Sequence, residues 1–537
     1  MYYKTASKIA FLVLAILSLF SIISCKSIAK ENPFRVANKK NQKPNIIIIY
    51  TDDQGYGDVS ALNPAAKFKT PNIDRIAKEG VIFTDGHSSD AVCTPSRYSL
   101  LTGRYSWRTA LKKGVLRADG PCLIEKNRMT IAALLKAHNY NTAMVGKWHL
   151  QMEFVGERGR GRDWSKPFTD GPIEKGFDYF FGIPASMNYG ILTYLENDRI
   201  LDPPVLWTKK KHNITSRTYR MTPPYDSEIG EGKGWIEVAP SFNDELVLET
   251  FTKKAVEYIN KSAQDVEKGK PFFLYLPLTS PHLPHCTHPD FQGRSNCGNY
   301  GDFMEETDYR IGQVLNALAD NNLEENTLVI FSSDNGAEKN YVYQRDTYAH
   351  YSSLHFKGGK RDIYEGGHRV PFLMRWPAII KAGRKVHIPV CQTDYLATIA
   401  DIIGVEIPDK AGEDSYSLFP VLKGEHFEKN IRGPVIHHSS AGYLAIRDGQ
   451  WKLNMLRGSG GTLKPKLIKP KNGEAIYELY NIVKDPSETM NLYFEHPEIV
   501  EKLTLQLTKI IKEGRSTPGT PQNYIKRNWK QLTWINE

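Results

Sequence analysis

Short apolar runs rich in β-branched residues recur along the chain, and segments with apolar positions at helical spacing lie between them. Four runs have the length and composition of buried parallel strands, at 45–50, 142–145, 272–276 and 327–331. The helical patterns fall at 72–79, 96–101, 129–138, 244–261 and 302–320. Because strands alternate with helices, the pattern predicts an α/β fold with a doubly wound sheet and helices on both faces.

The pattern changes after about residue 410. Residues 437–453 alternate between apolar and polar positions around Asp448-Gly449, which is a strong hairpin signal. A further strand is predicted at 476–480 and a terminal amphipathic helix at 495–513. We therefore expect a large domain at 44–410 and a smaller C-terminal α+β domain with an antiparallel sheet at 411–537.

The N-terminal segment has the composition of an export signal. Lys4 and Lys8 precede the apolar run 9–23, which is too short for a membrane span and is followed by a small residue. Ile22-Ile23-Ser24-Cys25 resembles a bacterial lipobox, in which the cysteine becomes the lipidated first residue of the mature chain. A plain secretory signal with a chance cysteine is the alternative.

These features predict a signal peptide at 1–24 and a polar tether at 25–43. The protein is then an exported bacterial lipoprotein whose lipid anchor on Cys25 holds it at the outer membrane, on the periplasmic or the surface face.

The net charge of +10 is spread along the chain rather than gathered in one block. A basic exported protein suits nucleic acid, anionic lipid or acidic polysaccharide as a partner, and solvated surface lysines are the alternative. Among the other cysteines, Cys286 and Cys297 are near enough in sequence to close a small disulfide loop in an exported protein. Unpaired buried thiols are the alternative.

Polar residues follow each of the four predicted strands. They are Asp52-Asp53, Lys147 to His149, Ser280 to His282, and Asp334-Asn335. Because ligands bind at the carboxyl ends of the strands in open α/β sheets, we expect these residues to converge on one crevice.

Asp52-Asp53 and Asp334-Asn335 offer hard oxygen ligands, which suit Ca²⁺ or Mg²⁺. Such pairs also cap helices and turns, but two pairs at strand exits favour a metal site. The histidine-rich stretch 282–288 is a rival zinc site. It is discounted because Pro281 and Pro284 prevent a regular helix there and no second ligand cluster is spaced to close the site.

Residues 151–240 are rich in Gly, Pro, Arg and aromatic side chains, with little periodicity. A segment of this length is expected to form functional loops over the crevice. Trp164, Trp207 and Trp235 are candidates for stacking on sugar rings, and ordinary packing is the alternative.

Thr94 is a good N-cap, Pro95 a good first helical residue, and Gly103 is placed to end the helix. Cys93 is therefore predicted at a helix N-terminus, where backbone N–H groups and the dipole favour an anion, and Arg97 adds a positive charge. This arrangement indicates an activated nucleophile beside an anion pocket. A thiolate, however, is a poor partner for a hard cation.

Residues 93–97, CTPSR, resemble the C-x-P-S-R signature of type I sulfatases, and residues 101–104, LTGR, resemble the auxiliary motif that follows it. The similarity continues through the segments 44–53, 146–149, 280–282, 333–336 and 358–371. The segments 180–185, 291–294 and 301–303 most resemble the branch of arylsulfatase A and N-acetylgalactosamine-6-sulfatase.

The resemblance implies an alkaline-phosphatase-like sheet and a formylglycine made from Cys93 by a maturation enzyme. It implies a Ca²⁺ site formed by residue 93 with Asp52, Asp53, Asp334 and Asn335. Arg97 and Lys147 would hold the formylglycine hydrate, and Lys360 would add positive charge around the sulfate. His282 would donate a proton to the leaving alcohol, and His149 would take a proton from the hydrate.

By this resemblance the protein is a calcium-dependent sulfatase for a sulfated polysaccharide or its oligosaccharides, with no nucleic-acid partner. Ulvan, carrageenan and glycosaminoglycans are the candidate polymers, and a 6-O-sulfated galactose-type sugar is the candidate unit. A phosphonate or phosphate ester hydrolase of the same superfamily is the nearest alternative. An inactive glycan-binding surface lipoprotein is another, although the complete set of site residues argues against it.

Overall fold

The computed structural model describes residues 42–158, 161–188, 190–209, 225–230, 234–425, 431–525 and 529–535. The predicted signal peptide at 1–24, the lipidation site Cys25 and nearly all of the predicted tether lie outside the described residues. Among the helices of the described ranges, none combines the length and the hydropathy that a bilayer crossing requires.

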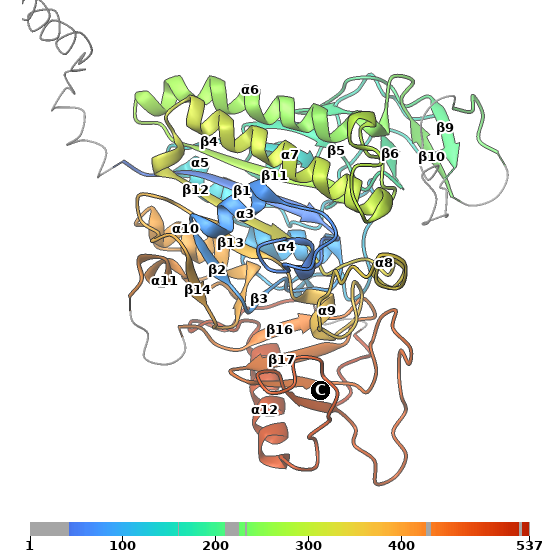
Figure 1. Cartoon of the computed structure of the whole chain (residues 1–537), viewed down its shortest axis with the longest axis vertical. Helices are drawn as coiled ribbons and strands as arrows, with labels where there is room; N and C mark the ends of the chain where they lie inside the picture. Colours follow the sequence, from blue (N-terminus) through green and yellow to red (C-terminus); the bar gives the residue numbers. More distant parts are fainter. Residues whose placement is uncertain are drawn as a thin grey trace, which may run out of the picture. The chain divides into compact units, whose positions relative to one another are not determined.

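A mixed sheet of ten strands forms the centre of the fold (Figure 1). In spatial order its strands are β14 (Arg384–Val386), β2 (Val81–Phe83), β13 (Phe372–Arg375), β12 (Thr327–Ser333), β1 (Asn45–Asp52), β11 (Phe272–Pro281), β4 (Asn141–Lys147), β5 (Tyr179–Ile183), β7 (Leu195–Glu196) and β8 (Arg199–Ile200). The four predicted strands are the adjacent parallel strands β12, β1, β11 and β4. The predicted sheet is confirmed, and shorter strands extend it on both sides.

The continuous apolar run of β1 is explained by burial on both faces of the sheet. Ile46, Ile48 and Tyr50 pack into one hydrophobic core, whereas Ile47 and Ile49 pack into a second core on the opposite face. All five side chains are fully buried. A strand with two buried faces has no polar face, so its sequence shows no alternation.

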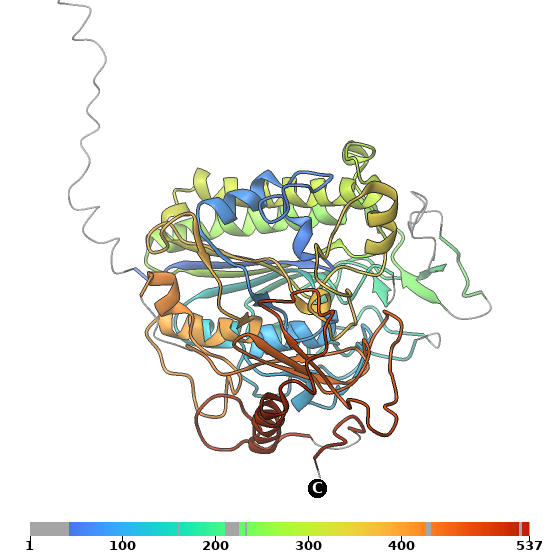
Figure 2. The same ribbon diagram turned by 60° about the horizontal axis from the view of Figure 1, so that its bottom comes forward.

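Helices cover both faces of the sheet (Figure 2). On one face lie α3 (Pro71–Lys78), α6 (Val247–Glu267) and α7 (Gly298–Asp320). On the other lie α4 (Cys93–Thr102), α5 (Ile131–Ala137) and α10 (Tyr395–Ile402). The predicted helices are confirmed, although α7 begins four residues earlier than its apolar pattern.

The C-terminal region contains an antiparallel sheet of β16 (Val435–His438), β17 (Leu444–Asp448), β18 (Trp451–Asn454) and β19 (Glu478–Asn481). The predicted hairpin is confirmed, because Asp448 pairs with Trp451 across the turn. The helix α12 (Pro497–Glu513) packs Leu503 and Leu507 against this sheet. The domain boundary at residue 410 stays a prediction.

The predicted disulfide between Cys286 and Cys297 is wrong, because the described cysteines form no disulfide. The Cys286 thiol donates to Asp244 Oδ2 at 2.9 Å. Cys297 instead lies in a separate apolar cluster with Phe68 and Met304. The two thiols therefore face different surroundings in spite of their short sequence separation.

Candidate active site

The polar residues after the four central strands converge, as the sequence predicts. Asp52 is the last residue of β1, Lys147 is the last residue of β4, and Asp334 directly follows β12. The Lys147 ammonium forms an ion pair with Asp52. All three side chains are fully buried. The carboxyl ends of the strands thus meet at one charged cluster.

Arg97 fixes one side of this cluster. Its Nε and Nη2 atoms donate to Asp334 Oδ2 at 3.1 and 2.8 Å, and its Nη1 donates to the Lys147 carbonyl at 3.1 Å. The guanidinium is fully buried, and its carboxylate partners keep its pKa raised in spite of that burial. Arg97 is therefore a permanent cation in a fixed orientation.

Asp53 organises the other side. Lys360 Nζ lies 2.6 Å from Asp53 Oδ1, and Asn335 Nδ2 donates to the same oxygen at 2.8 Å. His282 Nε2 lies 3.6 Å from Asp53 Oδ2. Lys360, Asn335 and His282 thus surround the Asp53 carboxylate.

A single glycine allows β4 to deliver Lys147 to the site. Gly146 has a φ of +137°, and a Cβ atom there would lie 2.0 Å from the Pro277 carbonyl oxygen. Only glycine tolerates both the backbone conformation and the approach to β11. This contact explains the glycine that precedes Lys147-Trp148-His149.

The oxygen atoms of the pairs Asp52-Asp53 and Asp334-Asn335 suit a hard divalent cation. Asp52 Oδ1 and Asn335 Oδ1 are buried and have no hydrogen-bond partner. Ligand atoms of Asp52, Cys93 and Asp334 lie within 4.8 Å of one another. Burial and the neighbouring Asp52 carboxylate raise the pKa of Asp334, which a bound cation would counteract. Buried, partnerless oxygen atoms between carboxylates are ligands that Ca²⁺ or Mg²⁺ accepts.

Cys93 is the first residue of α4, and the N-cap residue is Val92. The predicted N-cap at Thr94 is therefore wrong, because the Thr94 hydroxyl instead accepts a hydrogen bond from the Leu116 N–H at 3.3 Å. The predicted end of the helix is confirmed, since Gly103 adopts a φ of +63°. Burial raises the pKa of the Cys93 thiol, so the unmodified residue is a neutral thiol rather than an activated thiolate.

The loop before Cys93 is attached to the C-terminal sheet. The Ala91 N–H donates to the His438 carbonyl at 3.0 Å, and the His438 N–H donates to the Ser89 carbonyl at 3.2 Å. The His438 ring also bonds to Asp90 Oδ1 at 2.8 Å. Strand β16 thus helps to set the position of residue 93.

Two histidines flank the cluster and differ in their contacts. His149 Nε2 lies 3.1 Å from the Leu116 carbonyl, which can only accept, so Nε2 carries the proton and Nδ1 has the lone pair. His282 Nδ1 lies 2.5 Å from the Leu283 carbonyl, which directs Nε2 toward Asp53. Burial lowers the pKa of both rings. The Asp53 carboxylate partly opposes this effect at His282.

A pocket of about 360 Å³ lies beside His149, because Leu116 contacts that ring and also lines the pocket. Its polar lining includes Arg117, Asp119 and Glu237. Glu237 Oε2 is buried and has no hydrogen-bond partner. These residues carry no sequence motif, so the sequence alone does not identify them.

Only Trp235 of the three tryptophans considered for sugar stacking lines this pocket. It lies in β10 (Trp235–Val238), which pairs with β9 (Leu206–Lys209) and β6 (Ile191–Leu192). Trp207 lies in β9 outside the lining, and Trp164 packs edge-on against Phe154 at 5.8 Å. Ordinary packing therefore describes Trp164.

Two family models match the chain. The model described as Sulfatase matches residues 44–405, and the model described as N-sulphoglucosamine sulphohydrolase, C-terminal, matches residues 355–515.

Curated proteins and solved structures match over most of the chain. N-acetylgalactosamine-6-O-sulfatase of Bacteroides thetaiotaomicron is 33% identical over 495 residues, which cover 88% of this chain and 94% of that protein. Arylsulfatase A of Homo sapiens is 31% identical over 499 residues, which cover 89% and 90%. A solved structure from work on the metabolism of multiple glycosaminoglycans by Bacteroides thetaiotaomicron has a TM-score of 0.74 and 31% sequence identity. The match covers 87% of this chain and 99% of that chain.

Proposed function

The chain belongs to the sulfatase family and hydrolyses sulfate esters, and we propose that its substrate is a sulfated polysaccharide or an oligosaccharide derived from it. We further propose that it uses Ca²⁺ and a formylglycine made from Cys93. The observation that carries the proposal is the convergence of Cys93, three cations and two acidic pairs at the carboxyl end of the sheet.

Charge balance supports a bound cation. Asp52, Asp53 and Asp334 carry three negative charges, and Arg97, Lys147 and Lys360 carry three positive charges. Without a further cation, the cluster would offer no net attraction to a sulfate ester anion. Ca²⁺ held by Asp52, Asp53, Asp334 and Asn335 would supply positive charge opposite the sulfate oxygens.

The burial of the Cys93 thiol, and the poor match between a soft thiolate and a hard cation, both argue against a cysteine nucleophile. The Cys93 thiol is 2% exposed and its pKa is raised by burial, so it holds its proton. A hydrated formylglycine would instead offer an oxygen nucleophile and could expel sulfate by returning to the aldehyde. Because Cys93 is buried, the maturation enzyme would act on the chain before it folds.

The protein side chains then have separate tasks. Arg97 and Lys147 would orient the hydrate, and Lys360 would stabilise charge on the sulfate. His282 Nε2, which faces Asp53, would donate the proton that the leaving alcohol takes. His149 Nδ1 would receive the proton from the remaining hydroxyl group.

The pocket beside His149 supports a saccharide as the substrate. Its lining combines an aromatic ring, Trp235, with Arg117, Asp119 and Glu237, which can bind sugar hydroxyl groups. The similarity to N-acetylgalactosamine-6-O-sulfatase supports a 6-O-sulfated galactose-type sugar as the first candidate. Glycosaminoglycan, ulvan and carrageenan oligosaccharides should be compared directly.

Parallel assays test the reaction class. The matured enzyme is incubated with sulfated oligosaccharides of defined sulfate position and with matched phosphate and phosphonate esters. We expect release of sulfate from a saccharide, and a preference for phosphate or phosphonate would contradict the proposal. Mass measurement of the peptide containing residue 93, from protein made in its natural host, tests the formylglycine.

The lipobox resemblance at 22–25 supports an outer-membrane lipoprotein. Labelling with a fatty acid in the native host should modify the wild-type chain, and a Cys25→Ala variant should remain unlabelled. Labelling that persists in the variant would exclude an anchor on Cys25.

A further inference from the structure

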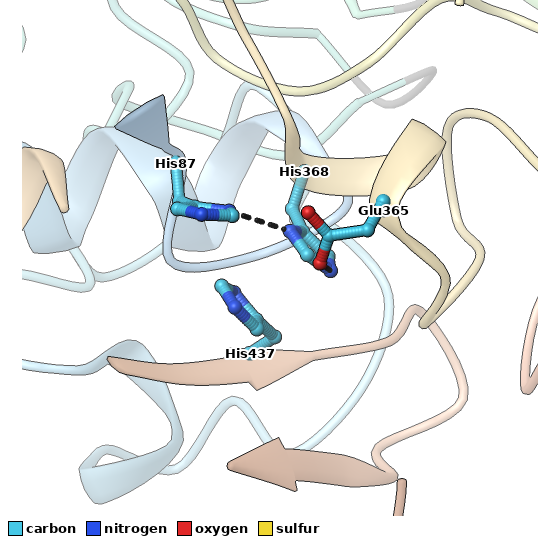
Figure 3. A group of neighbouring side chains, drawn as sticks. All are labelled: His87, Glu365, His368 and His437. Carbon is cyan, nitrogen blue, oxygen red and sulfur yellow. Dashed lines mark hydrogen bonds and ion pairs between the residues drawn. The ribbon is translucent and has the colours of Figure 1, made fainter. Parts of the chain in front are cut away.

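A second group of metal-ligating side chains lies apart from the acidic cluster. It consists of His87, Glu365, His368 and His437, whose ligand atoms lie within 4.8 Å of one another. The three rings come from β3 (Gly86–His87), α9 (Glu365–His368) and β16, and they converge (Figure 3). All four side chains are buried.

The contacts of His87 fix its proton. Its Nε2 lies 2.7 Å from Asp85 Oδ1, and Asp85 also pairs with Arg369 and Arg447. Although burial opposes it, these arginines hold the pKa of Asp85 well below its usual range. Asp85 is therefore an acceptor, and Nε2 carries the proton. The neutral ring then presents a lone pair at Nδ1.

The contacts of His368 lead to the same tautomer. Its Nε2 lies 3.0 Å from the Ile363 carbonyl, which can only accept. A proton on Nε2 leaves a lone pair on Nδ1, and this atom lies 3.1 Å from His87 Nδ1. Two lone pairs facing each other at this distance require a cation between them. Donation from the other ring nitrogen to a carboxylate or a carbonyl is also the usual arrangement of metal-bound histidine.

His437 provides the independent observation. Both of its ring nitrogens are buried and have no hydrogen-bond partner. Its ring lies nearly parallel to that of His368 with a centroid distance of 3.6 Å, and 4.7 Å from the His87 ring centroid, so it must turn for a nitrogen to point at an ion held by His368. A buried imidazole without any partner is costly unless a nitrogen binds an ion or a water molecule.

We propose that His87 Nδ1, His368 Nδ1 and a nitrogen of His437 bind a zinc ion that joins the catalytic sheet region to the C-terminal sheet. Imidazole nitrogens suit Zn²⁺, whereas the oxygen-rich acidic cluster suits Ca²⁺. The Glu365 carboxylate lies nearby and is shared between Arg369 and Lys452. The zinc is structural, because the site is closed to solvent.

One arrangement of protons would need no ion. Lys452 Nζ lies 3.1 Å from His368 Nε2 and could donate to it, which would let His368 Nδ1–H donate to His87. In that case the Ile363 carbonyl faces a lone pair at 3.0 Å, and His437 still has no partner. Lys452 also donates to Glu365 at 3.1 Å and to Glu488 at 2.9 Å, and its three N–H groups can serve all three acceptors. The zinc arrangement differs in giving partners to the Ile363 carbonyl and to His437.

Metal analysis of the full-length, untagged protein tests the proposal. The chain is produced with zinc in the medium and treated with a chelator to remove surface ions, and calcium is then restored. We expect one zinc ion per chain by elemental mass spectrometry. X-ray absorption at the zinc edge should show imidazole nitrogens at about 2.0 Å.

Two variants locate the ion. His437→Phe keeps a ring for stacking on His368 but has no nitrogen, and it should lose the zinc. His285→Gln, in the histidine-rich stretch 282–288, should keep it. Zinc that is absent from the wild-type chain, even after refolding with zinc, would overturn the proposal. Zinc retained by a folded His437→Phe variant would do the same.

The absorption spectrum needs no variant, so it decides the question even if His437→Phe does not fold. A first shell of carboxylate oxygens would place the zinc in the acidic cluster and overturn the proposal. The result is independent of the sulfatase reaction, because the test reads metal content and ligands rather than activity.

Discussion

Arg97 and Asp334 form a fully buried ion pair in which two guanidinium nitrogens donate to the same carboxylate oxygen, at 3.1 and 2.8 Å. The other oxygen of Asp334 accepts from the Asp53 N–H at 3.1 Å. Asp334 therefore joins the helix that begins at Cys93 to the end of β1. The position of the anion pocket depends on this one carboxylate.

Arg97→Lys should lower kcat by about 100-fold or more, because lysine cannot make the two bonds to Asp334 and also reach the Lys147 carbonyl. Arg108→Lys is the matched control, since Arg108 forms a similar buried pair with Asp414 at 2.7 and 2.8 Å. The control should lose stability and keep most of its kcat. Equal losses of kcat in both folded variants would contradict a specific role for Arg97.

Calcium should raise the melting temperature, because it would bind only the folded chain. At a concentration about 100 times its Kd, a ligand of this kind adds about 2.7 kcal/mol of stability. Asp334→Asn should abolish the shift, and Asp448→Asn, in the C-terminal hairpin, should retain it. Thermal unfolding with calcium and with a chelator gives the measurement. An identical shift in wild type and Asp334→Asn would exclude this ligand set.

Gly146→Ala should destabilise the protein by roughly 3 kcal/mol or more, since it combines a left-handed backbone with a clash at the Pro277 carbonyl. Gly449→Ala is the control, because Gly449 has a φ of +55° and no atom within 4 Å of the added Cβ. Its cost should be about 1–2 kcal/mol, which is the backbone contribution alone. Chemical denaturation measures both, and equal costs would show that the close approach of β4 to β11 is unimportant.

On the acidic side of the pH profile, kcat should fall only at a pH below the ordinary histidine pKa of about 6.5. Burial, with Lys147 and Arg97 adding to it, lowers the pKa of His149, so this base stays neutral as the pH falls through 6.5. His149→Ala should reduce kcat by about 10²–10⁴-fold. It should also accumulate sulfated protein, detectable by intact mass. Full activity in His149→Ala, or an acid limb centred above pH 6.5, would contradict the base assignment.

Glu237→Gln should raise KM for sulfated oligosaccharides by roughly tenfold, which corresponds to about 1.4 kcal/mol. The carboxylate oxygen has no partner in the pocket, and an amide provides a weaker acceptor for a sugar hydroxyl. Hydrolysis of a small aryl sulfate should fall much less. Trp207→Phe, outside the pocket lining, serves as the control. Equal effects of Glu237→Gln on both substrates would place the saccharide elsewhere.

The sequence was most informative where one strand is buried on both faces and ends at the site. Burial on both faces makes the run 45–50 continuously apolar, so the strand could be recognised. The pair Asp52-Asp53 stands out because it directly follows this run. The short strands β2 and β13 were missed because three or four residues show no periodicity. The start of α4 was misplaced because Thr94 bonds to Leu116, a tertiary contact that no local pattern reveals.

Neither the pocket nor the histidine cluster has a sequence signature. Arg117 lies in a loop and Glu237 in β10, and only the tertiary fold brings them to one pocket. His87, His368 and His437 lie in three distant segments. The spacing of residues in a motif identifies ligands that lie in one helix, strand or loop, whereas these three histidines lie in three different elements.

The backbone bonds between Ala91 and His438 have a practical consequence for protein engineering. A chimaera that takes its last domain from a relative would replace the strand that supports the approach to residue 93. Such a hybrid would keep the position of residue 93 only where the new strand repeats the bonds that His438 makes to residues 89–91. The segment 88–92 and strand β16 should therefore be exchanged together.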